Sequence, residues 1–198
     1  SGVSGATSSV YTTPSLVYAN DNNDQYRCEV NAPGASAPVY SNTVTLTVQR
    51  TFTITAQPAN TTGNEGSTAS LAVTVNASSG TPTYQWERSD DGGANYAPVG
   101  GATSATYVTP TLVYANDNDD RYRCVVSLVG SAGDSTSTFA VLTVLRVITI
   151  TQQPADLGVI EGAQGTFTIA ASITSDVVSY QWNLSTDDGN TFSPINGA

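Results

Sequence analysis

Short runs in which Val, Ile, Thr and Tyr alternate with polar residues follow one another along the chain, separated by Gly, Pro, Asn and Asp. A period of two places the apolar side chains on one face of a strand, so each run is predicted to be a half-buried β-strand. No stretch shows the helical period of 3.6, so the sequence predicts an all-β protein with no helix. In the middle of the chain the predicted strands are 51–57, 70–75, 83–88, 104–109, 121–126 and 139–145.

The same pattern occurs more than once in the chain. The stretch 5–28 aligns without a gap with the stretch 101–124, and most of the aligned positions are identical. The same offset of 96 residues relates Arg50 to Arg146 and Tyr84-Gln85-Trp86 to the Tyr-Gln-Trp at 180–182. A constant offset indicates that one domain-sized unit is repeated in tandem with a period of 96 residues.

Each unit carries a recurring set of aromatic residues. In the middle of the chain a Glu-Gly pair precedes an alternating strand, Tyr-Gln-Trp follows at 84–86, and Tyr-Arg-Cys follows at 122–124. This arrangement resembles the immunoglobulin superfamily, particularly the I-set-like repeats of bacterial surface proteins and phage virion fibre proteins. The resemblance implies tandem immunoglobulin-like β-sandwiches. It also implies that Trp86 and Trp182 are buried on strand C, and that Tyr26 and Tyr122 are the tyrosine-corner residues of strand F.

The two cysteines depart from the antibody pattern. Cys28 and Cys124 each lie two positions after a strand-F Tyr, but Val73 and Ile169 occupy the strand-B position where an antibody domain has the partner Cys. Two Cys at the same position of separate units are too far apart for a bridge. We therefore expect no disulfide, and we expect Cys28 and Cys124 to be small buried core residues beside a Trp.

The repeat divides the chain into one complete unit and two halves. Residues 50–146 form a complete unit, 1–49 match its second half (strands E to G), and 147–198 match its first half (strands A to C). Two explanations remain open. The chain is a window from a longer repeat polypeptide, or neighbouring copies complete the halves along a fibre. Both predict that copies of the chain or flanking repeats are arranged head to tail, with semi-rigid joints because no Gly or Ser linker separates the units.

Charge and composition exclude several classes of partner. All six basic residues are Arg, there are sixteen acidic residues, and the net charge is −10. This charge repels phosphate backbones and anionic lipids, so neither nucleic-acid binding nor membrane insertion is predicted. No apolar run approaches the roughly 20 residues that a membrane helix needs. The abundance of Ser, Thr, Gly and Asn is typical of secreted β proteins, and we expect an extracellular, cell-surface or virion location.

Two acidic runs are the candidate metal ligands. The runs at 20–24 and 116–120 have the oxygen-rich side chains that Ca²⁺ prefers. The alternative is that they form the turn between strands E and F, since Asn and Asp favour turns and the Gly and terminal Glu of an EF-hand are missing. No other cofactor is predicted. The candidate calcium ligands are Asp21, Asn22, Asp24, Asp117, Asp119 and Asp120.

No residue set points to catalysis. The chain has no His and no Lys to activate a nucleophile, and it is predicted not to be an enzyme. The predicted function is a structural spacer in a long extracellular or virion fibre. The alternative is an adhesion module that binds a cell-surface glycan or protein through variable loops. Those loops are the F–G connections at 31–40 and 127–138 and the B–C connections at 76–80 and 174–178.

Overall fold

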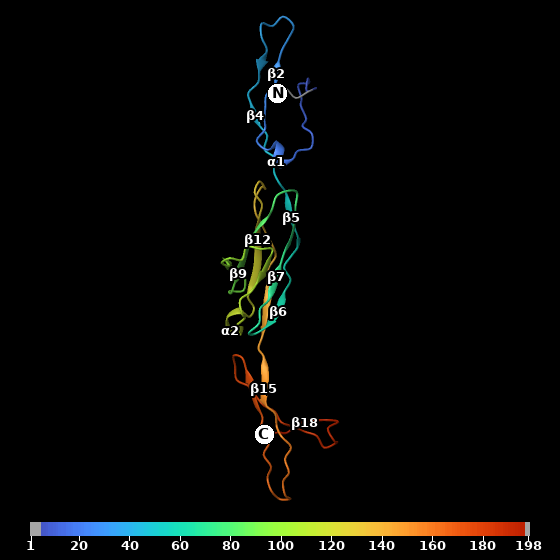
Figure 1. Cartoon of the computed structure of the whole chain (residues 1–198), viewed down its shortest axis with the longest axis vertical. Helices are drawn as coiled ribbons and strands as arrows, with labels where there is room; N and C mark the ends of the chain where they lie inside the picture. The colour runs from blue at the N-terminus through green and yellow to red at the C-terminus, as the bar shows by residue number, and fades with distance from the viewer. Residues whose placement is uncertain (1–4, 197–198) are drawn as a thin grey trace.

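A computed structural model describes residues 5–196. Residues 1–4 of the predicted half 1–49 and residues 197–198 of the predicted half 147–198 lie outside this range. Figure 1 shows an elongated molecule in which three segments follow one another along the long axis in chain order. The middle segment contains the packed core, and a thinner segment lies on either side of it.

The larger sheet of the middle segment has the strand order β10–β9–β12–β14–β6, and β13 also pairs with β12. Strand β6 runs parallel to β14, whereas the other neighbours are antiparallel. The long pair β9–β12 forms the centre of this sheet, with seven residue pairs in register. The strands are β6 (Thr61–Asn64), β9 (Thr83–Ser89), β10 (Ala97–Pro98), β12 (Arg121–Ser127), β13 (Ser135–Thr136) and β14 (Ala140–Leu145).

A second layer faces this sheet. In it, β5 (Phe52–Ala56) pairs with β8 (Thr74–Ala77), and β7 (Ser70–Ala72) pairs with β11 (Thr106–Val108). Val73 separates β7 from β8, and its N–H donates to the Ala105 carbonyl at 3.0 Å. Residues of both layers form one buried cluster, which confirms the predicted all-β, immunoglobulin-like sandwich.

Trp86 lies at the centre of the core and is fully buried. Its Nε1 donates to the Ser104 carbonyl at 2.9 Å, and its ring centre lies 6.2 Å from that of Tyr107. Cys124 lies opposite Trp86 in the β9–β12 register and is also fully buried, so burial raises the pKa of its thiol to about 11. The Tyr122 hydroxyl donates at 3.5 Å to Oδ2 of Asp120, which lies two residues earlier in the chain.

The flanking segments contain short two-stranded pairs. The pairs are β1 (Gln25–Tyr26) with β4 (Val44–Thr45), β2 (Glu29–Val30) with β3 (Val39–Tyr40), β15 (Ile148–Gln152) with β16 (Ala170–Ile173), and β17 (Asn183–Leu184) with β18 (Ser193–Pro194).

The environment of the flanking core residues differs from the expectation. Tyr26 and Trp182 are only half-buried, and Cys28 is exposed rather than buried. In the middle segment, β9 pairs with the strand that contains Cys124, β12, and the second layer covers that sheet. Among residues 5–196 no strand equivalent to β9 pairs with β1 or β2, which flank Cys28, so the Cys28 thiol is open to solvent.

The prediction of no helix is wrong at the scale of a single turn. Helices α1 (Tyr18–Asp21) and α2 (Tyr114–Asp117) each have four residues. Asp21 Oδ2 accepts a hydrogen bond from the Val17 N–H at 2.6 Å, and Asp117 Oδ2 does the same for the Val113 N–H at 2.7 Å. One turn is too short to show a helical period, so the sequence pattern does not reveal it. Within residues 5–196 neither helix has the length and apolarity needed to span a bilayer.

Candidate functional site: the joints between successive segments

An Arg stacked on a Tyr marks each joint. Arg50 Cζ lies 3.9 Å from the ring centre of Tyr18, and Arg146 Cζ lies 3.8 Å from that of Tyr114. Each Tyr is the first residue of a one-turn helix, and each Arg lies two residues before the first strand of the following segment, β5 or β15. A guanidinium over a tyrosine face contributes about 0.5–2 kcal/mol, depending on how far water is excluded.

Each Arg also reaches the following segment. Arg50 Nε donates to Ser79 Oγ at 3.2 Å, and Arg146 Nε donates to Ser175 Oγ at the same distance. The second nitrogen of each guanidinium makes a further bond. Arg50 Nη1 donates to the Val129 carbonyl at 2.9 Å, and Arg146 Nη1 donates to Asp176 Oδ2 at 2.7 Å. One planar side chain therefore connects the helical turn of one segment to the B–C loop of the next.

The backbones are also in contact at the first joint. The Arg50 N–H donates to the Gly130 carbonyl at 2.8 Å. Gly130 has a φ of +88°, and a Cβ at this position would collide with the ring of Tyr18. Gly130 therefore meets two requirements, the left-handed backbone and the close approach of the F–G loop to the preceding segment.

Glu65 adds a carboxylate to the second joint. Its Oε1 accepts from the Tyr114 N–H at 3.1 Å, and its Oε2 accepts from Ser175 Oγ at 2.9 Å and from the Thr174 hydroxyl. The hydrogen bond from Thr174 is the largest cause that lowers the pKa of Glu65 below its usual value. Glu65 remains ionised at neutral pH and connects the middle segment to the third.

Part of each joint is visible in the sequence. Arg50 and Arg146 share the repeat offset, Leu-Val-Tyr-Ala-Asn-Asp recurs at the same offset, and no linker separates the segments. The stacking of each Arg on the Tyr of that motif is not visible, because the two residues are far apart in the chain. Glu65 stands out in the sequence only as part of a repeated Glu-Gly pair. The use of Arg alone as the basic residue is the available signal, since a guanidinium can stack and donate at the same time.

Two of the three predicted calcium ligands of the middle segment lie beside Arg88. Asp120 pairs with Arg88 Nε, and Asp117 Oδ1 lies 3.6 Å from Arg88 Nη2. Burial raises the pKa of Asp120, while the Arg88 guanidinium opposes this. Asp119 has a φ of +68° and accepts from the Asn118 side chain at 3.0 Å. The structure thus brings Asp117 and Asp120 together, beside a cavity of about 550 Å³ that also borders on Arg88.

In the first segment the equivalent residues hold the turn. Asp21 accepts from the Val17 N–H, and Asn22 Oδ1 accepts from the Val48 N–H at 3.0 Å. Asp24 is exposed. Over the described residues no group of three or more Asp, Glu, His or Cys side chains lies together as a metal site would require. Calcium binding stays a prediction, and the contacts of these side chains are those of a turn.

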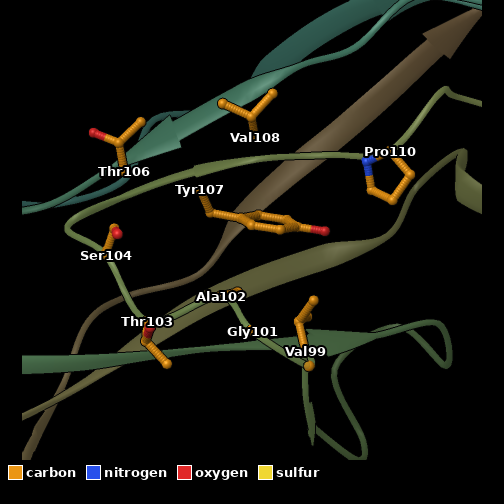
Figure 2. Close-up of a pocket in the computed structure, with 10 residues that line it drawn as sticks. Val99, Gly101, Ala102, Thr103, Ser104, Thr106, Tyr107, Val108 and Pro110 are labelled. Atoms are coloured by element: carbon orange, nitrogen blue, oxygen red, sulfur yellow. The ribbon is translucent and has the colours of Figure 1, made fainter.

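A second cavity, of about 380 Å³, lies beside the loop that leads into β11 (Figure 2). The Tyr107 ring extends over Val99 and Ala102, whereas Thr106 and Val108 point to the other side of the strand. The lining contains no carboxylate, Cys or His, and its polar side chains are the hydroxyls of Ser, Thr and Tyr. This lining lacks an acid–base pair.

Residues 53–146 match the family model described as Domain of unknown function (DUF8696). No curated protein matches the chain. Several solved structures of immunoglobulin domains are similar to it. A chimeric titin Z1Z2 carrying a decorin peptide has 24% identity and a TM-score of 0.35, over 48% of this chain and 93% of that one. Sidekick-1 immunoglobulin domains 1–5 have 16% identity and a TM-score of 0.41, over 80% of this chain and 34% of that one. The tandem Ig repeats of Dlar have 18% identity and a TM-score of 0.36, over 65% of this chain and 64% of that one. The strand order of the middle segment, rather than these likenesses, carries the immunoglobulin-like assignment.

Proposed function

We propose that this chain is a structural spacer, a linear array of immunoglobulin-like units that holds a fixed length and direction in an extracellular, cell-surface or virion fibre. The observation that carries the proposal is the repeated joint. At both joints an Arg stacks on the Tyr of the preceding segment and donates to a Ser of the following one. A joint built twice in the same way gives each segment a defined orientation relative to its neighbour.

The absence of a linker supports the same proposal. β14 ends at Leu145 and β15 begins at Ile148, so only Arg146 and Val147 connect the last strand of one segment to the first of the next. The Arg146 side chain stacks on Tyr114 of the preceding segment and donates hydrogen bonds to Ser175 and Asp176 of the following one. Few backbone torsions remain free, and the joints are expected to bend little. The partners of the array are copies of the chain or flanking repeats, arranged head to tail.

The position of the loops favours a spacer over an adhesion module. The B–C loop of the middle segment provides Ser79, and its F–G loop provides Val129 and Gly130, to the first joint. These are the loops that an adhesion module would use to bind a glycan or protein. A glycan array and a cell-binding assay on the whole chain test this alternative. Saturable binding that is lost when residues 131–136 are replaced by Gly and Ser would establish adhesion instead.

Small-angle X-ray scattering at low protein concentration tests the stiffness of the joints. The scattering of the wild-type chain should fit a single extended shape. The double variant Arg50→Ala and Arg146→Ala should lose the stack and the hydrogen bonds at both joints, and it should have a shorter average maximum dimension and the profile of a flexible chain. The thermal unfolding of the middle segment should remain unchanged, since the core residues are untouched.

A matched control keeps this experiment specific. Arg121 stacks on Phe139 at 4.6 Å, and both residues belong to the middle segment. Arg121→Ala removes an interaction of the same kind and should leave the scattering unchanged. The spacer proposal is rejected if the wild-type chain itself scatters as an ensemble with widely different angles between segments.

A further inference from the structure

Both flanking segments expose large apolar side chains. Val30 and Val44 are 61% and 62% exposed in the first segment. Phe167 is 55% exposed in the third. Soluble proteins rarely expose many such side chains together unless a partner covers them. The middle segment indicates what kind of surface would cover them.

In the middle segment the equivalent positions are covered. Val126, one repeat after Val30, is fully buried, and Leu71, one repeat before Phe167, is 2% exposed. Every member of the buried cluster has an apolar or glycine counterpart in one of the two flanking segments. Residues 147–196 supply Gly165, Phe167, Ile169 and Trp182, and residues 5–49 supply Ala6, Leu16, Tyr26, Cys28, Val30, Val44, Leu46 and Val48. The two flanking segments together contain one complete core.

We propose that residues 147–196 of one copy of this chain and residues 5–49 of a second copy fold together into a composite sandwich. The inference rests on the head-to-tail array proposed above and names the surface and the partner that would build it. The two surfaces differ, so the association is heterologous. Because they lie at opposite ends of an elongated molecule (Figure 1), we expect an open array rather than a closed ring. Each added copy therefore presents a new free segment and extends the array.

The pairing of β9 with β12 predicts the register of the composite sheet. Trp86 lies opposite Cys124, and Tyr84 lies opposite Val126. The counterparts of the β9 residues lie one repeat later in the sequence, and those of the β12 residues lie one repeat earlier. The expected pairs are therefore Trp182 of one copy opposite Cys28 of the other, and Tyr180 opposite Val30. The sheet would then cover the Cys28 thiol and provide β1 and β2 with the neighbouring strand that they lack among residues 5–196.

Two further pairings cover other exposed side chains. Tyr107 of β11 lies opposite Leu71 of β7, and the counterparts are Tyr11 and Phe167. Leu142 of β14 lies opposite Thr61 of β6 in the parallel pair, and the counterparts are Leu46 and Leu157. Tyr11, Phe167 and Leu157 are all exposed in the single chain. By analogy with Leu71, Tyr107 and Thr61 of the middle segment, the composite buries Phe167 and half-buries Tyr11 and Leu157.

One contact of the middle segment is missing from the composite. Leu184 stands at the position of Arg88, so Asp24, the counterpart of Asp120, has no guanidinium to pair with. A carboxylate buried without its partner weakens the association. Leu184→Arg should restore the pair and lower the dissociation constant by about tenfold or more.

Sedimentation of the whole chain over a range of concentrations tests the proposal. The mass should rise with concentration in steps of 20.4 kDa, past the dimer. Alkylation with a maleimide gives an independent readout. Cys28 should react rapidly in dilute protein and slowly in concentrated protein, whereas the buried Cys124 should stay unreactive at both.

A pair of variants makes the test specific. Val30→Glu places a charge at the composite core and should abolish both the mass increase and the protection of Cys28, with the thermal unfolding of the middle segment unchanged. Val129→Glu introduces the same charge at a side chain that is 75% exposed and outside the composite core, and it should leave association intact.

Three results overturn the proposal. They are a mass of 20.4 kDa at all concentrations, an assembly that stops at the dimer, and a Cys28 reaction rate that is independent of concentration. None of them bears on the stiffness of the joints, which scattering measures on the single chain. Failure of the composite and failure of the spacer proposal are therefore distinguishable.

Discussion

Replacement of Trp86 by Ala is the sharpest test of where the stability of the chain lies. Trp86 is fully buried, and its side chain removes about 150–250 Å² from water, which corresponds to about 4–6 kcal/mol at about 25 cal/mol per Å². The substitution also leaves the Ser104 carbonyl without its donor, at a cost of about 1 kcal/mol, while partial collapse of the cavity recovers some of the loss. We expect a net loss of about 4–5 kcal/mol of a total of about 5–15 kcal/mol.

Urea unfolding followed by circular dichroism measures this loss, and it should be done in dilute protein so that copies remain separate. Trp182→Ala is the matched control. Trp182 is only half-buried in the single chain, so its removal should cost less than about 2 kcal/mol and leave the main transition in place. A loss below about 2 kcal/mol for Trp86→Ala, or an equal effect of the two variants, would refute the view that the middle segment alone holds a packed core.

Three further predictions concern the metal, the turns that contain Asp91 and Asp187, and the first joint. Excess EDTA should leave the melting temperature unchanged, because the Asp120 and Asp117 carboxylates are held by Arg88; a lower melting temperature that Ca²⁺ restores would establish the calcium site. Hydrogen bonds lower the pKa of the Asp91 and Asp187 carboxyls, in Asp187 to about 2. The largest contribution comes from Asn95 in Asp91 and from Thr191 in Asp187. The stability that these ionised carboxylates provide is therefore complete above the unfolded pKa of about 3.9 and is lost as the pH falls toward about 2. Asp91→Asn should reduce the fall in melting temperature at acid pH. An unchanged fall would contradict this reasoning. Gly130→Ala should loosen the first joint, seen as increased scattering flexibility with little change in the unfolding of the middle segment, whereas Gly133→Ala in open space should have no effect.

The fold was accessible from the sequence because its determinants are periodic. Alternating side chains predicted the strands, and the resemblance of the Tyr-Gln-Trp and Tyr-Arg-Cys motifs to the immunoglobulin superfamily implied an immunoglobulin-like sandwich, which the strand order confirms. The one-turn helices at Tyr18 and Tyr114 escape such reasoning, because a single turn stabilised by one Asp side chain has no periodic pattern. The acidic runs are compatible with turns and with calcium ligands, since both uses require oxygen atoms. Their contacts to Arg88 and to backbone N–H groups depend on tertiary structure.

The environment of Cys28 and the joints depended on information that a local pattern does not contain. Cys28 and Cys124 have nearly identical sequence neighbours, yet one is exposed and the other fully buried, because burial is decided by strands that are distant in the sequence. The stack of Arg50 on Tyr18 likewise joins residues that are far apart in the sequence. A copied motif showed that these positions matter, but only the packing showed which side chain contacts which.

The parallel pairing of β6 with β14 determines how a pulling force would act on the molecule. Tension along the long axis of the molecule enters the middle segment through its first strands and leaves through β14, which continues almost directly into β15. Because β6 and β14 run in the same direction, a pull on the two ends slides one strand along the other instead of peeling them apart. The four register pairs from Leu142–Thr61 to Leu145–Asn64 are loaded together and must break together, so the middle segment resists extension most strongly along the axis on which the flanking segments lie (Figure 1).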